Sequence, residues 1–331
     1  MFGFYRYALA LLVAFGHIHW AFQGVWNWTG GYAVFSFFAL SGYLMTRVLH
    51  VTYGYGTRGL LAYGVNRFLR IYPAYWAALI LSLAILYLAP VEGRPPAMPA
   101  MPATLEAYFR NFALLGLHTF YKPTVVPPAW SLHLELIFYV LLGLGISRTR
   151  GRTMVWIAVM LAWTAWAVLS DLSFGERYGN AMAAALPFAL GAGLHHAPGF
   201  GSKTFLAAAS VCFAANLLAP PALWGDPLGP ARFYVSLALT VAVIASLRHL
   251  RWHGKWEAWD RRLGDLSYPI FLVHAQIGHL VTMLLPAQTS VTTVFLVSLL
   301  PVHLIAVALD LSVAQPIEAI RRRVRPHRDV A

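Results

Sequence analysis

The sequence predicts an all-α integral membrane protein with about ten transmembrane helices and both chain termini in the cytoplasm. Hydrophobic residues make up 59% of the 331 residues and charged residues 11%, whereas a soluble domain is about 45–50% apolar and about 25% charged. The apolar residues form continuous runs instead of alternating with polar ones, which favours helices over a membrane β-barrel. The single cysteine, Cys212, excludes an intrachain disulfide, so helix packing must hold the fold.

The spans follow from apolar runs that are long enough to cross the hydrocarbon core, which takes about 20 helical residues. They are 5–22, 32–50, 71–90, 128–146, 153–170, 179–196, 204–219, 232–248, 267–285 and 291–314. The first run is followed by AFQGVWNWTGG, which lacks a small-residue cleavage site, so we expect it to remain as a helix.

The basic residues set the orientation. An even number of spans puts both termini on one side, and the arginine-rich tail RRRVRPHR at 321–328 indicates that this side is the cytoplasm. With this orientation 19 of the lysines and arginines lie inside and 5 lie outside. The net charge of +12 is therefore explained by the positive-inside rule, without a nucleic-acid partner.

Domain organisation follows from the same reading. No internal repeat or soluble-domain boundary is visible, so we expect one transmembrane domain over 1–317 and a basic cytoplasmic tail over 318–331. The longest outer loop, 91–127, begins VEGRPPAMPAMP, which is too rich in proline for regular helix. We expect this loop to cap an outer cavity.

The first predicted helix carries two polar groups, Arg6 and His17, on either side of an apolar stretch. Eleven residues of α-helix rise about 16 Å and turn through about 1,100°, so the two side chains share a face. Arg6 then lies at the cytoplasmic surface and His17 in the outer half of the bilayer. His19 points the opposite way. An ionisable group inside a span is costly and indicates a functional site, although a snorkelling anchor and a satisfied core histidine are the plain alternatives.

Glu135 is predicted at a similar depth in the helix that contains PPAWSLHLELIFYVLL. Ser131 and Tyr139 lie one turn to either side of it and share its face. A carboxylate beside an imidazole fixes its tautomer and raises its basicity, which is what a general base requires. We therefore expect Glu135 to orient His17, with a structural hydrogen bond as the alternative.

Arg67 and Arg70, in NRFLRIYPAYW, lie three residues apart and so stack on one face of a helix that enters the membrane from the cytoplasm. Two stacked guanidiniums suit a phosphate group. The positive-inside rule alone would also place arginines here. By contrast, Ser41 beside Gly42 is interpreted as a small residue for close helix packing. His274 is expected to line the ligand path or to bridge two helices.

Five segments together carry a resemblance to a known family. YRYALALLVAFGH, FFALSGYLMTR, NRFLRIYPAYW, PPAWSLHLELIFYV and LGDLSYPIFLVH occur in the order found in the acyltransferase 3 family of integral-membrane acyltransferases. The match runs from Arg6 to about His274. The resemblance implies Arg6 and His17 as the basic residue and histidine of the first helix, Arg67 and Arg70 as acyl-CoA-binding residues, and a WSL…E…FY element that contains Ser131, Glu135 and Tyr139.

The resemblance further implies the reaction. A member of this family moves an acyl group, most often acetyl, from cytoplasmic acyl-CoA to a hydroxyl of a glycan or lipid-linked sugar, in the plasma (inner) membrane. The nucleotide would stay at the inner mouth near Arg67 and Arg70, with Arg47 and Arg58 as further candidates. His17 would either deprotonate the acceptor hydroxyl or carry the acyl group itself. His19 is the other candidate imidazole.

Two further expectations concern cofactors and class. No histidine cluster has metal-ligand spacing, so we predict no metal. A proton-coupled secondary transporter could use His17 and Glu135 as a proton relay, but such folds usually show two matching halves with broken helices. Neither feature is visible, so the sequence favours the acyltransferase.

Overall fold

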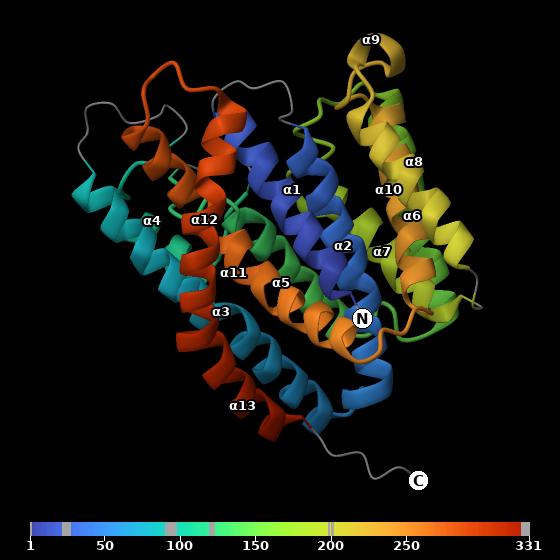
Figure 1. The fold of residues 1–331 in the computed structure, drawn as a ribbon. Helices are drawn as coiled ribbons and strands as arrows, with labels where there is room; N and C mark the ends of the chain where they lie inside the picture. The colour runs from blue at the N-terminus through green and yellow to red at the C-terminus, as the bar shows by residue number, and fades with distance from the viewer. Residues whose placement is uncertain are drawn as a thin grey trace.

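A computed structural model describes residues 2–21, 28–89, 98–118, 123–197, 199 and 202–325. The described chain is helical (Figure 1). Its elements are α1 (Gly3–Ala21), α2 (Thr29–Val48), η1 (Leu49–Tyr53), α3 (Thr57–Leu88), α4 (Leu105–Ala113), α5 (Ala129–Gly143), α6 (Arg150–Leu169), α7 (Ala181–His196), α8 (Lys203–Leu218), α9 (Pro221–Trp224), α10 (Pro230–Leu247), α11 (Lys255–Leu284), α12 (Val291–Leu309), η2 (Asp310–Ala314) and α13 (Gln315–Val324).

Each of the ten predicted spans overlaps a helix of the structure. Five helices within the described ranges are long and apolar enough to cross a membrane: α2 with η1, α3, α6, α10, and α12 with the elements that follow it. The shorter α5 and α8 are also apolar. These helices support a multi-pass membrane protein, while the number of spans and their direction stay predictions.

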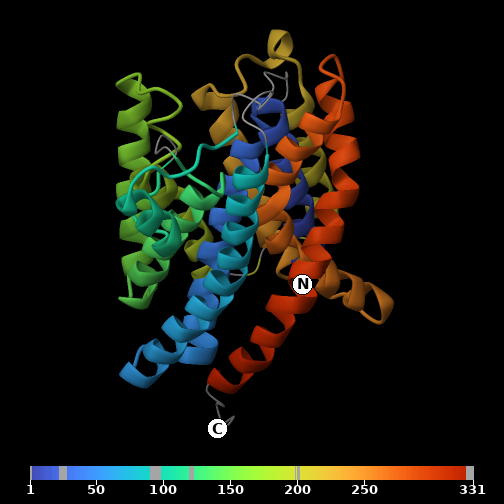
Figure 2. The same ribbon diagram turned by 90° about the vertical axis from the view of Figure 1, so that its left-hand side faces the viewer.

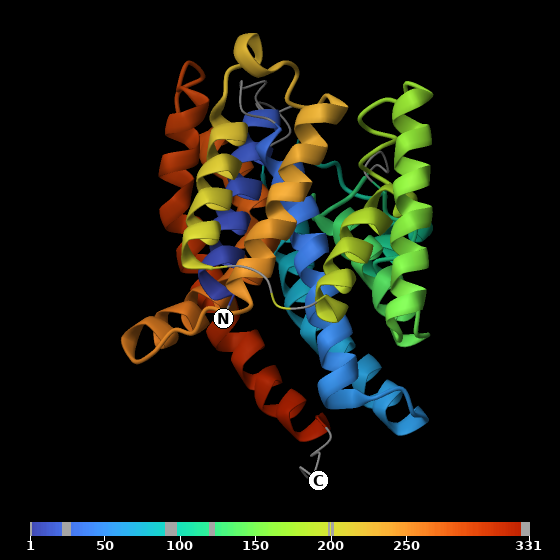
Figure 3. The same cartoon turned by 90° about the vertical axis from the view of Figure 1, so that its right-hand side faces the viewer.

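Two helices are longer than their predicted spans. α3 begins at Thr57 instead of residue 71, and α11 begins at Lys255 instead of residue 267. Each continues through an internal proline, Pro73 or Pro269, without a break in the helix. The first turns of α11 project sideways from the bundle (Figures 2 and 3). The extra turns of α3 place Arg67 and Arg70 well inside a helix.

The bundle is organised around α2, which packs against α1, α5, α7 and α10. Glycine allows the close approach of α2 and α7, because a Cβ at Gly42 would meet the Phe188 carbonyl oxygen at 2.2 Å and a Cβ at Gly191 would meet that of Ala39 at 1.8 Å. On the other side α1 packs against α11, which packs against α12. α2 therefore contacts both α1 and α5, whereas α11 is a direct neighbour of α1.

The loop predicted to cap an outer cavity contains a short amphipathic helix, α4. Its N-cap is Thr104, whose hydroxyl accepts from the Ala107 amide, and its carbonyl end contacts α3 through the Tyr75 hydroxyl, which donates to the Asn111 carbonyl at 2.5 Å. The first part of the proline-rich stretch, residues 91–97, lies outside the described residues, and its last part, residues 98–102, is not helical, as predicted. Whether the loop caps a cavity stays a prediction.

Candidate functional site

A cavity of about 150 Å³ lies inside the bundle between α1, α2, α3, α5 and α11. Its polar lining combines three arginines with a carboxylate and several hydroxyl groups. These residues are Arg6, Ser41, Arg67, Arg70, Ser131, Glu135, Tyr139, Ser267 and Tyr268. Apolar side chains of α2 and α11, including Phe37 and Phe271, complete the wall. The structure thus brings to one cavity six residues that the sequence analysis selected: Arg6, Arg67, Arg70, Ser131, Glu135 and Tyr139.

Arg67 is held by neutral groups. Its Nη2 donates to the Asn66 Oδ1 at 2.9 Å and its Nη1 to the Met45 sulfur at 3.2 Å. The guanidinium also lies over the Tyr63 and Tyr139 rings, at 5.8 and 5.9 Å from the ring centroids. These contacts fix the side chain without neutralising its charge, since cation–π contacts and amide acceptors leave the positive charge in place.

Arg70 and Arg6 complete the cationic side of the cavity. Arg70 lies over the Tyr268 ring at 5.6 Å, and the Tyr268 hydroxyl is anchored on the Ile71 carbonyl at 2.9 Å. Arg6 packs over Gly264, where a Cβ would come within 2.6 Å of its Nη2. Across the described residues, none of Arg6, Arg67 and Arg70 forms an ion pair with a carboxylate. All three are half-buried, and Asp265 is a carboxylate close enough to act on Arg6 and Arg70 without forming an ion pair. Three partly desolvated cations with one nearby carboxylate of this kind favour an anionic ligand.

Glu135 faces the same cavity from α5. Its Oε1 accepts a hydrogen bond from the Ser41 hydroxyl at 2.6 Å and another from the Tyr139 hydroxyl at 2.5 Å. The Ser131 hydroxyl donates to the Pro128 carbonyl and lines the cavity. The shared face of Ser131, Glu135 and Tyr139 is therefore confirmed. Ser41 was interpreted only as a small packing residue beside Gly42, and the structure adds a polar role, because its hydroxyl donates to the carboxylate.

His17 is partly exposed and pairs with His274 of α11: its Nδ1 lies 2.7 Å from the His274 Nε2, and the rings are stacked at 9°. The His274 Nδ1 lies 3.1 Å from the Ile270 carbonyl oxygen. Because a carbonyl only accepts, His274 Nδ1 carries the proton and its Nε2 accepts from the His17 Nδ1–H. The lone pair of His17 is thus left on Nε2, as in a general base.

The structure pairs His17 and Glu135 differently from the expectation. His17 bonds to His274 and Glu135 bonds to Ser41 and Tyr139, so within the described residues the carboxylate does not orient the imidazole. The reason is which helices become neighbours, because α11 packs directly on α1, whereas α5 packs against α2, α3 and α7. The similar depth predicted for His17 and Glu135 therefore did not imply a contact between them.

The histidine pair lies directly behind the cavity wall. Phe271 lines the cavity, and its ring centroid is 6.2 Å from that of His274, one helical turn further along α11. Phe271 also contacts Phe37, with centroids 6.0 Å apart and the rings edge to face. The Phe271 ring therefore contacts both the cavity and His274, and Phe37 packs against that ring.

Other candidates lie elsewhere. Arg47 is exposed at the end of α2 and does not line the cavity. His19 is buried and packs its ring against Phe15 at 4.3 Å. His133 bonds to the Leu114 carbonyl. In the described ranges no group of three or more histidine, cysteine, aspartate or glutamate side chains is placed to hold a metal ion, and the absence of a metal stays a prediction.

The sequence reasoning missed two contributors to the cavity. Tyr268 holds Arg70, and it belongs to the quoted segment LGDLSYPIFLVH, from which only His274 was selected. Ser41 belongs to the quoted segment FFALSGYLMTR. In both cases the motif was visible, but the partner lies on another helix, so the spacing along the chain gave no signal.

Long apolar helices around a cation-lined cavity define a multi-pass helical membrane protein whose site is built for a charged ligand. A comparison with protein families then gives the class of enzyme, because the acyltransferase 3 model, described as an acyltransferase domain, matches residues 4–311. The chain belongs to this family and is an acyltransferase. No curated protein and no solved structure matched the chain. Family membership favours acyl transfer over proton-coupled transport.

Proposed function

We propose that the protein transfers an acyl group, acetyl in the first place, from cytoplasmic acyl-CoA to a hydroxyl of a glycan or lipid-linked sugar. In this proposal the chain crosses the plasma (inner) membrane ten times, with both termini in the cytoplasm. The observation that carries the proposal is the cavity in which Arg6, Arg67 and Arg70 have no carboxylate partner among the described residues. Family membership supplies the reaction class.

The donor fits this cavity by charge and by shape. The phosphates of acyl-CoA would lie against the guanidiniums of Arg67 and Arg70, which can each donate two parallel hydrogen bonds to a phosphate. The narrow pantetheine arm would then extend along the cavity. Glu135 has its Oε2 without a hydrogen bond in the described structure, so we assign it to an N–H of that arm and not to His17.

The chemical step uses His17. Its Nε2 accepts the proton of the acceptor hydroxyl, the oxygen attacks the thioester carbonyl carbon, and the carbon–sulfur bond breaks to release the CoA thiolate, which takes up a proton. His274 keeps the His17 tautomer and stabilises the imidazolium through the 2.7 Å hydrogen bond. Alternatively, Nε2 attacks the thioester itself and passes the acyl group on. Either route requires the Phe37 and Phe271 rings to let the thioester reach the imidazole.

Release of free CoA from acetyl-CoA by the purified protein tests this proposal, with intact protein mass recorded for a bound acetyl group. We expect His17→Ala to lower turnover by about 10²–10⁴-fold, as for loss of a general base, with acetyl-CoA binding retained. His274→Ala should act in the same direction but less, because it removes only the orienting partner. An acetyl adduct on wild type that is absent from His17→Ala would select the acyl-histidine route.

His19→Ala is the matched control, since His19 lies two residues away on α1 and packs against Phe15 outside the pair. It should retain turnover. If His19→Ala lost turnover and His17→Ala did not, His19 and not His17 would be the general base, and the proposed role of His17 would be wrong. A wild-type protein that neither binds nor cleaves any acyl-CoA would overturn the donor assignment.

A further inference from the structure

The C-terminal helix α13 lies beyond the residues matched by the acyltransferase family, which end at 311. It packs against α3, the helix that carries Arg67 and Arg70. Its sequence, QPIEAIRRRV, places Arg321 in the interface, where it is 6% exposed, and leaves Arg322 and Arg323 exposed. The helix therefore has a buried cation at its interface with α3 and two exposed cations.

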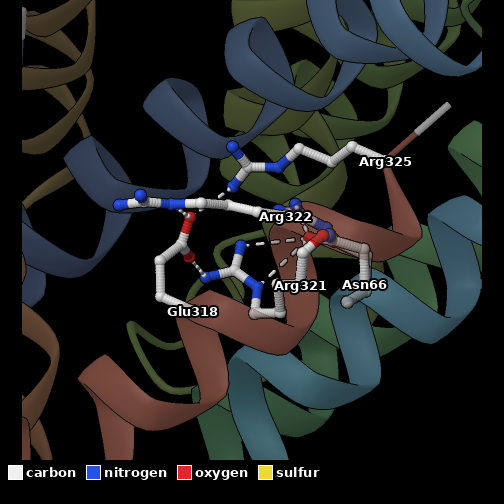
Figure 4. Close-up of polar contacts among 6 residues, drawn as sticks. Asn66, Glu318, Arg321, Arg322 and Arg325 are labelled. Carbon is white, nitrogen blue, oxygen red and sulfur yellow. Dashed lines mark hydrogen bonds and ion pairs between the residues drawn. The ribbon is translucent and has the colours of Figure 1, made fainter. Parts of the chain in front are cut away.

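The side-chain amide of Asn66 connects this helix to Arg67 of the cavity. Asn66 of α3 is 0% exposed. Its Oδ1 accepts from the Arg321 Nε at 3.2 Å, from the Arg321 Nη2 at 3.0 Å and from the Arg67 Nη2 at 2.9 Å. Its Nδ2 donates to the Arg321 carbonyl at 3.2 Å. Figure 4 shows the Arg321 guanidinium between Glu318 on one side and Asn66 on the other. Arg321 thus fixes the amide that fixes Arg67.

The charges at this junction do not balance. Arg321 and Arg70 both line a second cavity of about 10 Å³ between α3, α11 and α13, and the positive charges of Arg70 and Arg67 act on Arg321. Glu318 pairs with Arg321, and it also pairs with Arg322 and Arg325 at 3.8 and 2.8 Å. Asp265 is a second carboxylate and lines the same cavity as Arg70 and Arg321. Two carboxylates, Glu318 and Asp265, beside Arg70, Arg321, Arg322 and Arg325 still leave a net positive charge at the Arg67 and Arg70 mouth, which favours an anion.

We propose that α13 is part of the donor site, an inference that rests on the function proposed above. Arg321 is a positioning residue that holds Arg67 through Asn66. The exposed Arg322 and Arg323 surround the nucleotide end of acyl-CoA, which carries a diphosphate and a third phosphate, with positive charge. The tail helix then serves recognition of the nucleotide and not of the acyl group.

Kinetics with two acyl-donor substrates distinguish a role of α13 in nucleotide recognition from a purely structural role. Acetyl-CoA carries the nucleotide, whereas S-acetyl-pantetheine keeps the thioester and the arm but lacks the phosphates. In Arg321→Ala we expect the KM for acetyl-CoA to rise about tenfold, as for loss of charge-assisted hydrogen bonds, with kcat within about twofold. Kinetics with S-acetyl-pantetheine should equal those of the wild type. Arg321→Lys, which keeps the charge but not the planar fork, should give an intermediate KM.

Two further variants keep the test decisive if Arg321→Ala does not fold. In the double variant Arg322→Ala and Arg323→Ala, both positions are exposed, and we expect the KM for acetyl-CoA alone to rise by about threefold, since exposed charges are screened. Arg261→Ala is the control, because Arg261 is exposed on α11 and pairs with Glu257 away from this junction.

The outcomes distinguish the two proposals. An unchanged KM for acetyl-CoA in Arg321→Ala and in the double variant overturns the role of α13 while wild-type turnover keeps the proposed function. Equal losses with both donors also overturn it, because they indicate a structural role. Absence of any acyl-CoA binding by the wild type overturns both.

Discussion

Two sets of arginines inside the helical bundle have different surroundings. Arg232, in the first turn of α10, is 2% exposed, and all its donor nitrogens are satisfied by backbone carbonyls. Its Nε and Nη2 donate to the Asn216 carbonyl at 3.0 and 2.8 Å, its Nη2 also to that of Ala219 at 2.5 Å, and its Nη1 to that of Gly225 at 3.1 Å. These carbonyls belong to the C-terminal end of α8 and the segment after it, where helical carbonyls lack intrahelical partners.

In contrast to Arg232, the cavity arginines do not have every guanidinium nitrogen bonded to a backbone carbonyl. Arg67 and Arg70 lie over aromatic rings, as Arg232 does, but they are half-buried and line a cavity. Neither forms an ion pair with a carboxylate among the described residues. The comparison teaches that burial of an arginine does not itself indicate function. What matters is whether its donors end on the protein's own backbone or point into a space that a ligand can fill.

The largest effect is expected for Arg232→Ala. Several carbonyls at the end of α8 would lose their donor together, so we expect a loss of about 3–4 kcal/mol in the free energy of unfolding, or a fall in Tm of roughly 10 °C. Thermal unfolding in detergent measures this effect. The KM for acetyl-CoA of the remaining folded protein should not change.

Arg232→Lys is the control for this prediction. Lysine keeps the positive charge near the α8 carbonyls but cannot donate in several fixed directions at once. It should therefore recover only part of the lost Tm. A normal Tm in Arg232→Ala, or a selective rise in KM, would show that this arginine is not a structural cap and would remove the contrast.

Arg70→Ala tests the opposite member of the comparison. We expect donor affinity to fall by about 10–100-fold, because a charge-assisted contact to phosphate is lost. The Tm without donor should change little, since Arg70 is half-buried and forms no ion pair in the described structure that would be lost. Acetyl-CoA binding and thermal unfolding with and without donor measure both quantities. A Tm that falls as far as in Arg232→Ala, with binding intact, would make Arg70 structural too.

The sequence predicted the contacts within one helix of this site but not the contacts between helices. Ser131, Glu135 and Tyr139 share a face because four residues make about one helical turn, and this was visible in the sequence. The His17 and His274 pair joins residues 257 positions apart, and the sequence contains no rule for which helices become neighbours. For the same reason the α8 carbonyls around Arg232 could not be predicted, because backbone acceptors have no residue-type signal.

The smallest effect is expected at Tyr268, whose ring lies under Arg70. Tyr268→Leu removes the ring and should weaken acetyl-CoA binding by about 2–5-fold, the range of a cation–π contact of about 0.5–1 kcal/mol. Tyr268→Phe keeps the ring and loses only the hydroxyl bond to the Ile71 carbonyl, so it should bind donor nearly as well as the wild type. The two variants separate the ring from the hydroxyl in one binding titration. Equal losses in both would mean that the bond to α3, and not the ring, sets the position of Arg70, and the aromatic hold on the cavity cations would then apply to Arg67 alone.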